Sequence, residues 1–228
     1  MNIREELFKR QDKKYQVFTN RLIPGIDESK TIGVRIPQIR ELAKVVDEET
    51  KYQFLQEMPH EYFEENNLHR FIIERLKNYD EVIYYLDIFL LYANNWSLTD
   101  GFTNKQVEKN KDKYLVKIKE WLNTDRIYTK RFAISQLMRY YLDGDFKKDY
   151  LDLVGSVTTN EYYLEMMIAW YFATALAKKY EATLEYLKKH ELNDATTKML
   201  LGKVRDTFRI SEDRKETIKE LLWKMKNK

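Results

Sequence analysis

The stretch Leu164-Glu-Met-Met-Ile-Ala-Trp-Tyr-Phe-Ala-Thr-Ala-Leu-Ala177 decides the fold class of this chain. Four of its apolar residues, Leu164, Met167, Ile168 and Tyr171, stand at relative positions 0, 3, 4 and 7. This spacing places them on one face of an α-helix. No glycine or proline interrupts the stretch, so it predicts a helix that buries an apolar face in a core.

The same helical period recurs along the chain. Similar apolar stripes begin at Ile39, Leu68, Val82, Tyr114, Ala133 and Ile218. Short polar joints such as 123–125 and 193–194 separate the stripes, and no long linker occurs. Because short joints make successive helices antiparallel, we expect an all-α fold, an α-solenoid of HEAT-like helix pairs that form a curved superhelix. We expect residues 1–228 to form a single domain of this kind.

The composition excludes several other classes of protein. Only 6 glycines and 3 prolines occur in 228 residues, too few for the turns of a β-sandwich or barrel. There is no cysteine, which excludes disulfide frameworks and metal sites built on thiolates. The glycines form no phosphate-binding loop. We therefore expect neither a metal nor another cofactor.

Histidine offers little metal chemistry. The chain has 3 histidines, and two of them, His60 and His69, are nine residues apart on one predicted helix. Ligands on one helix face are normally three or four residues apart, so we assign these two side chains no role.

The charge and hydropathy patterns indicate a cytoplasmic protein. The longest apolar run, 84–93, contains Asp87 and is too short to span a bilayer. The first ten residues carry charges where a signal peptide has an apolar core.

The net charge is only +3, yet residues 193–228 hold ten basic and six acidic residues. This basic segment fits either a nucleic-acid contact or a solvated face with ion pairs.

The segment Asn94-Asn-Trp-Ser-Leu-Thr-Asp100 is the first candidate site. If it is helical, Trp96 and Asp100 lie one turn apart and share a face. In the alternative interpretation, Trp96 is a core residue and Asp100 caps the helix that begins near Thr103. The pattern alone favours this alternative.

Arg131 and Trp170 each allow a functional and a structural interpretation. Arg131 lies beside the apolar face of a predicted helix, where an arginine either extends its charge to solvent or pairs with an anion. Trp170 lies in the most apolar predicted helix, where core packing is the usual role.

Four motifs follow one another in a recognisable order. They are Gly33-Val-Arg-Ile-Pro-Gln-Ile-Arg-Glu-Leu-Ala-Lys44, the segment 94–100, Lys130-Arg-Phe-Ala-Ile134 and Ala169-Trp-Tyr171. Together they resemble the AlkC/AlkD family of DNA alkylation repair proteins, HEAT-like repeat DNA glycosylases. The chain is similar to the shorter branch of this family, which lacks the extra N-terminal helices.

The resemblance implies a metal-independent glycosylase that releases N3- or N7-alkylated purines from double-stranded DNA on a concave basic face. It implies that Asp100 stabilises the cation left on the sugar and orients a water. The family pattern implies that Trp96 and Trp170 pack against the deoxyribose and offer their π-faces to this cation. It places Arg131 on the adjacent phosphate.

We assign three more side chains, Lys130, Lys203 and Arg205, to DNA contact. A second function stays open, a catalytically weak or inactive scaffold that binds nucleic acid or a protein partner. In either case we expect a monomer.

Overall fold

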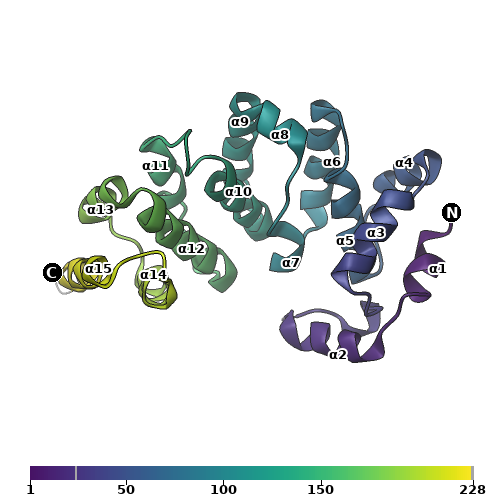
Figure 1. The fold of residues 1–228 in the computed structure, drawn as a ribbon, viewed down its shortest axis with the longest axis horizontal. Helices are drawn as coiled ribbons and strands as arrows, with labels where there is room; N and C mark the ends of the chain where they lie inside the picture. The colour runs from purple at the N-terminus through teal and green to yellow at the C-terminus, as the bar shows by residue number, and fades with distance from the viewer. Residues whose placement is uncertain (24, 227–228) are drawn as a thin grey trace. The chain divides into compact units, whose positions relative to one another are not determined.

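The computed structural model describes residues 1–23 and 25–226, and this part of the chain is built from helices alone (Figure 1). Helices account for 71% of the residues. Neighbours in the chain pack on one another, as α5 on α6 and α9 on α10 do. The predicted all-α class is confirmed, and the stacking of successive helices is that of an α-solenoid.

The chain divides into two compact units, unit 1 (Met1–Asn110) and unit 2 (Lys111–Lys228). The single domain expected from the sequence stays a prediction. Each unit has its own apolar core, and each is described separately below.

Unit 1 is organised around one central helix, α5. Its elements are α1 (Ile3–Phe8), α2 (Lys13–Leu22), the 3-10 helix η1 (Glu28–Lys30), α3 (Ile36–Val45), α4 (Glu48–Gln56), α5 (Phe63–Ile73), α6 (Tyr79–Tyr92), α7 (Trp96–Thr99) and α8 (Lys105–Lys109). Helix α5 packs against α1, α3, α4, α6 and α7. As a result it buries polar as well as apolar side chains, among them Glu64, Asn67, His69 and Arg70.

The glycine of the first motif holds a sharp turn in front of α3. Gly33 has φ 90°, a left-handed conformation that favours glycine. A Cβ atom here would lie 2.6 Å from the Asp12 carbonyl oxygen and from the Gln16 Cβ. The backbone N–H groups of residues 32, 33 and 34 donate to the Glu64 carboxylate at 2.8, 2.7 and 3.3 Å. The motif therefore ties the chain before α3 to α5.

Unit 2 is organised around α12. Its helices are α9 (Lys111–Leu122), α10 (Ile127–Tyr140), α11 (Asp149–Gly155), α12 (Tyr162–Lys178), α13 (Tyr180–Lys189), α14 (Asp194–Asp206) and α15 (Glu212–Lys226). Helix α12 packs against α10, α11, α13 and α14. It contains the stretch 164–177, and all four residues of the predicted apolar stripe are buried. The helix predicted from this stretch is confirmed.

Two buried tyrosine hydroxyls of unit 2 are hydrogen-bonded within its core. The Tyr171 hydroxyl donates to the Tyr150 carbonyl at 3.1 Å, and the Tyr114 hydroxyl donates to the Gln136 side chain at 3.0 Å. Each hydroxyl is satisfied within the core, as a buried polar group must be. Among the described residues of the chain, no helix combines the length and the hydropathy that a bilayer span requires.

Candidate functional site

The segment 94–100 forms a single helical turn, α7. The Asn95 side chain accepts a hydrogen bond from the Ser97 N–H at 3.0 Å and donates to the Asn94 side chain at 2.9 Å. This N-cap begins the helix at Trp96. The N–H of Asp100 donates to the Trp96 carbonyl at 2.9 Å and closes the turn. Trp96 and Asp100 therefore lie at the two ends of one turn, as the helical interpretation predicts.

The helix stops at this point because the backbone changes direction. Asp100 is the C-cap, with φ −86° and ψ 144°, and Gly101 follows in the left-handed region with φ 83°. Asn104, not Asp100, caps the next helix, since its side chain accepts from the Gln106 N–H at 2.7 Å. Trp96 is only partly buried. The alternative interpretation of Asp100, as the cap of the helix that begins near Thr103, is wrong, because Asn104 holds that position. The role of Trp96 at the site stays a prediction.

The Asp100 loop is attached to the C-terminal end of α5. Arg70 Nη1 donates to the Asp100 carbonyl at 3.3 Å. Asn104 Nδ2 lies 3.1, 3.1 and 3.0 Å from the carbonyl oxygens of residues 73, 74 and 76. The Asp100 side chain is partly exposed, and the Thr99 hydroxyl lies 3.2 Å from its Oδ1. A partly exposed carboxylate is thus carried by a fixed backbone, which suits it to stabilise a cation.

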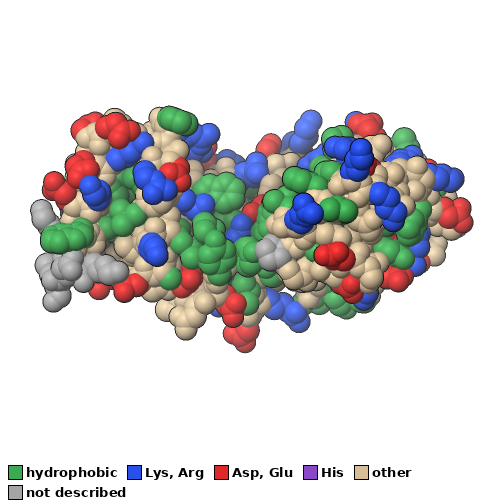
Figure 2. All heavy atoms as spheres, turned by 90° about the horizontal axis from the view of Figure 1, so that it is seen from below, with side chains coloured by type: hydrophobic (Ala, Val, Ile, Leu, Met, Phe, Trp, Pro, Cys, Tyr) green, Lys and Arg blue, Asp and Glu red, His purple; other side chains and the backbone are tan. Residues whose placement is uncertain are grey.

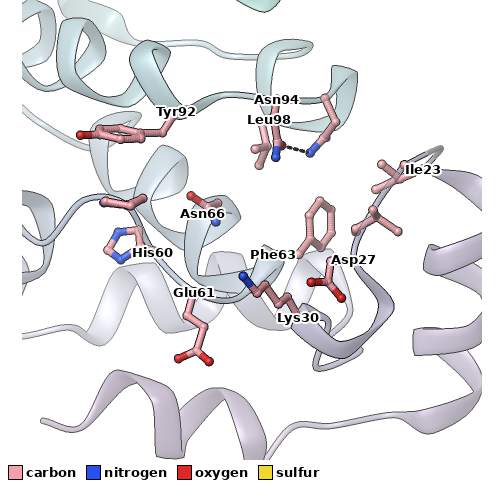
Figure 3. Close-up of a pocket in the computed structure, with 14 residues that line it drawn as sticks. Ile23, Asp27, Lys30, His60, Glu61, Phe63, Asn66, Tyr92, Asn94 and Leu98 are labelled. Carbon is pink, nitrogen blue, oxygen red and sulfur yellow. Dashed lines mark hydrogen bonds between the residues drawn. The ribbon is translucent and has the colours of Figure 1, made fainter.

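A cavity of about 400 Å³ lies beside α7 in unit 1 (Figure 3). Asn94, Asn95 and Leu98 contribute to its wall, whereas Trp96 and Asp100 do not. Figure 3 shows His60 and Asn66 facing the cavity from the opposite side. No local sequence pattern indicates this cavity, because its wall combines residues from three separate segments, 23–30, 59–66 and 92–98.

His60 and His69 form a pair in which His69 is buried and His60 is partly buried. His60 Nε2 lies 2.8 Å from His69 Nδ1, and the rings stack on Phe54 and Phe89 respectively. Burial lowers the pKa of His60 to about 4 and holds that of His69 well below its usual value. The prediction that both lie on one helix is wrong, because His60 precedes α5. Their contact joins a loop to a helix, which sequence spacing along one helix does not reveal.

Arg131 lies on α10 in unit 2 and is almost wholly buried, with 4% of its surface exposed. Its Nη1 donates to the backbone carbonyl of Tyr163, at the start of α12. The arginine therefore links α10 to α12. Its neighbour Lys130 is partly exposed. Phosphate contact by either side chain stays a prediction.

Trp170 and Lys203 come together on α12 and α14. The Trp170 side chain is 40% exposed, so the core-packing interpretation is wrong. Lys203 Nζ lies 5.5 Å from the centre of the Trp170 ring, within the range of a cation–π contact. The two predicted site residues thus form one partly exposed, positively charged aromatic surface.

The basic C-terminal segment is largely a face of ion pairs. Arg205 Nε lies 2.8 Å from Asp206 Oδ1, and the hydrogen bond to this carboxylate raises the Arg205 pKa. Lys215 and Lys219 pair with glutamates three residues earlier. Figure 2 shows Lys and Arg side chains interspersed with Asp and Glu side chains over the visible face. The side chains of Lys224, Lys226 and Lys228, counted in the predicted basic segment, lie outside the described residues.

No group of three or more His, Asp or Glu side chains in the described part of the chain is arranged to hold a metal ion. The chemistry available at the α7 turn is that of one carboxylate and one indole. The sequence matches the DNA alkylation repair enzyme family over residues 3–220.

The chain belongs to this family. Comparison with individual curated proteins gives no match. Membership in the DNA alkylation repair family supports a role in alkylation repair and implies an interaction with DNA. It also confirms the resemblance inferred from the four motifs. In this member of the DNA alkylation repair family, the 33–44 motif stabilises unit 1, whereas the 94–100 motif presents side chains to the surface.

Proposed function

We propose that this protein removes N3- or N7-alkylated purines from duplex DNA by a metal-independent glycosylase reaction, with Asp100 as the central carboxylate. The observation that carries the proposal is the α7 turn. It holds a partly exposed carboxylate one turn from an indole, in a chain of the DNA alkylation repair family.

The chemistry requires little from the protein. An alkylated purine already carries positive charge and leaves readily, so no strong general acid is needed. The cation that develops on the sugar is what needs stabilisation, and a carboxylate supplies it electrostatically. Asp100 also orients the water that attacks the anomeric carbon. Trp96, at the other end of the α7 turn, offers an aromatic face to this cation.

Basic side chains in unit 2 supply the phosphate contacts. Lys203 supports this role best because it lies beside the partly exposed Trp170. Lys130 is partly exposed. Arg205 is already paired with Asp206, and Arg131 is buried against a backbone carbonyl. Both contribute less charge to the surface, so phosphate contact rests mainly on the two lysines.

The test is base release from duplex DNA that carries 7-methylguanine or 3-methyladenine, with enzyme in excess. We expect release by the wild-type protein and a loss of about 100-fold or more in Asp100→Asn, because the main electrostatic contribution is removed. The matched control is Asp125→Asn, which removes the same charge at an exposed position in unit 2, outside the α7 turn. We expect this variant to retain the wild-type rate.

Two results would contradict the proposal. Absence of release above background by the wild-type protein would exclude the glycosylase activity. Equal rates for the Asp100 and Asp125 variants would exclude the assigned role of Asp100. An inactive protein that still bound DNA with a steep dependence on salt would be the scaffold considered above.

A further inference from the structure

Arg70 occupies an unusual place for an arginine. It lies in the middle of the buried surface of α5, and only 5% of its surface is exposed. Its Nη1 donates to Glu74 Oε1 at 2.9 Å and to the Asp100 carbonyl at 3.3 Å. The guanidinium also lies 4.5 Å from the centre of the Phe71 ring. One buried cation therefore joins α5 to the residue that carries the proposed catalytic carboxylate.

Glu74 fixes the orientation of this guanidinium. Its side chain is 7% exposed and pairs with both Arg70 and Arg40. Arg40 Nη1 lies 2.8 Å from the second carboxylate oxygen, and its guanidinium lies 4.0 Å from the centre of the Phe71 ring. The two arginines thus share a carboxylate and an aromatic ring, but the hydrogen bond to Asp100 comes from Arg70. Arg40 is a natural control.

The Asp100 backbone needs an external restraint. Helix α7 has only four residues, and a helix this short is not stable by itself. The peptide after Asp100 leads into Gly101, and glycine adds conformational freedom to the chain. The carbonyl that Arg70 binds belongs to this same peptide. A hydrogen bond here restrains the ψ angle of Asp100 and with it the direction of the side chain.

We propose that Arg70 is a positioning residue that orients the Asp100 carboxylate through its backbone carbonyl. The inference rests on the proposed function, because it assigns Arg70 a part in the same reaction. Arg70 lies too deep in unit 1 to contact DNA. Its effect should therefore fall on the rate of the chemical step and not on DNA affinity, since misplaced catalytic groups cost rate.

The experiment compares Arg70→Met with Arg40→Met in single-turnover base release at saturating enzyme. We expect the rate constant to fall about 10- to 100-fold in Arg70→Met and less than about 2-fold in Arg40→Met. The DNA dissociation constant should be the same for both variants. A merely structural role would lower the folded fraction, and therefore the amplitude of the reaction, without changing its rate constant. Arg70→Lys, which keeps a donor, should recover part of the rate and serves where Arg70→Met folds poorly.

A double variant tests whether Arg70 acts through Asp100. If it does, adding Arg70→Met to Asp100→Asn should not slow the reaction further. Equal rate constants for the Arg70 and Arg40 variants would overturn the inference, and so would independent, multiplicative losses in the double variant.

Hydrogen exchange separates this inference from the proposed function. Arg70→Met should accelerate exchange in residues 96–104, and Arg40→Met should not, whether or not the protein cleaves any glycosidic bond. A wild-type protein that releases no base would contradict the proposed function. Unchanged exchange in Arg70→Met would contradict the positioning of Asp100 by Arg70.

Discussion

Helices α5 and α12 hold the same place in their units but bury different chemistry. Each packs against several neighbouring helices and exposes little of its surface. Helix α5 buries two carboxylates, an amide, an imidazole and a guanidinium, those of Glu64, Glu65, Asn67, His69 and Arg70. Helix α12 buries mainly aliphatic and aromatic side chains, with Glu165 as its buried charge.

The difference follows from what each helix contacts. Three polar side chains of α5 bind loops: Glu64 binds residues 32–34, Arg70 binds Asp100, and His69 contacts His60, whereas Asn67 donates to a carbonyl of its own helix. The N–H and C=O groups of a loop have no hydrogen-bond partners of the kind that a helix provides for its own backbone, so other groups must bind them. Helix α12 packs mostly on other helices, whose backbones are already satisfied. Buried polar residues on a helix therefore mark the places where it supports irregular chain.

The largest expected effect is on stability, from the loss of one carboxylate of α5. Glu64→Gln keeps one oxygen for the N–H groups of residues 33 and 34 but places an NH2 donor against the N–H of Ile32, and it removes the negative charge that all three N–H groups bind. We expect it to lower the free energy of unfolding by about 2–4 kcal/mol, since a buried donor loses its acceptor and the other two lose a charged one. Urea unfolding followed by circular dichroism measures the change.

Glu165→Gln on α12 is the matched control. Glu165 accepts a hydrogen bond from Asn193 Nδ2 at 3.0 Å, and glutamine keeps an oxygen that can accept it. We expect a loss of less than about 1 kcal/mol. Equal losses at the two positions would show that α5 and α12 do not differ in the way described.

Acid should weaken unit 1 through its histidine pair. Burial lowers the His60 pKa to about 4, against small raising effects of Glu65 and Glu57 and a lowering effect of Arg4. The unfolded chain therefore binds more protons than the folded chain between pH 6.5 and pH 4. His60 contributes full stability above pH 6.5, and the contribution is lost as the pH falls towards 4. Between pH 7 and pH 5 we expect a loss of about 2 kcal/mol.

The measurement is urea unfolding at pH 7, 6 and 5. His60→Asn should flatten the pH dependence in this window, and the control His190→Asn should leave it unchanged, because His190 is exposed in unit 2. Carboxylates with lowered pKa values, such as Asp47 at about 2, act at lower pH and do not interfere. A wild-type protein equally stable at pH 7 and pH 5 would contradict the expectation.

The smallest expected effect on stability concerns the surface that α12 presents. Lys203→Met removes a partly exposed cation from the Trp170 ring, and we expect a stability change within about 1 kcal/mol. DNA affinity should fall, and the slope of its logarithm against the logarithm of salt concentration should decrease by about 1. Fluorescence anisotropy at several salt concentrations measures both.

Arg205→Met is the control for this variant. Arg205 is exposed but already paired with Asp206, so the salt dependence should change less than in Lys203→Met. Identical salt slopes in wild-type protein and Lys203→Met would exclude Lys203 as a phosphate contact.

The sequence predicts helices, because their apolar residues recur at a local spacing. It does not predict polar contacts between residues that lie far apart in the chain. The apolar stripe of α12 is predictable because helical spacing is local, whereas the pattern around Asp100 favours a capping role that the structure contradicts. Arg70 and Glu64 were not recognised, since their partners lie about 30 residues away and a charged residue in a helix usually points to solvent. The left-handed turn at Gly33 left one local signal, a glycine shortly before a helix with proline in its first turn.

Asn104 links the ends of two helices through one side chain. Its side-chain oxygen accepts a hydrogen bond from the N–H of Gln106 at the start of α8. Its Nδ2 donates to three carbonyl groups at the end of α5. Neither helix end can fray without the other, so the loop from Asp100 to Asn104 opens only together with the last turn of α5. The proposed catalytic carboxylate therefore belongs to the same cooperative folding unit as the buried helix behind it, although it lies in a loop.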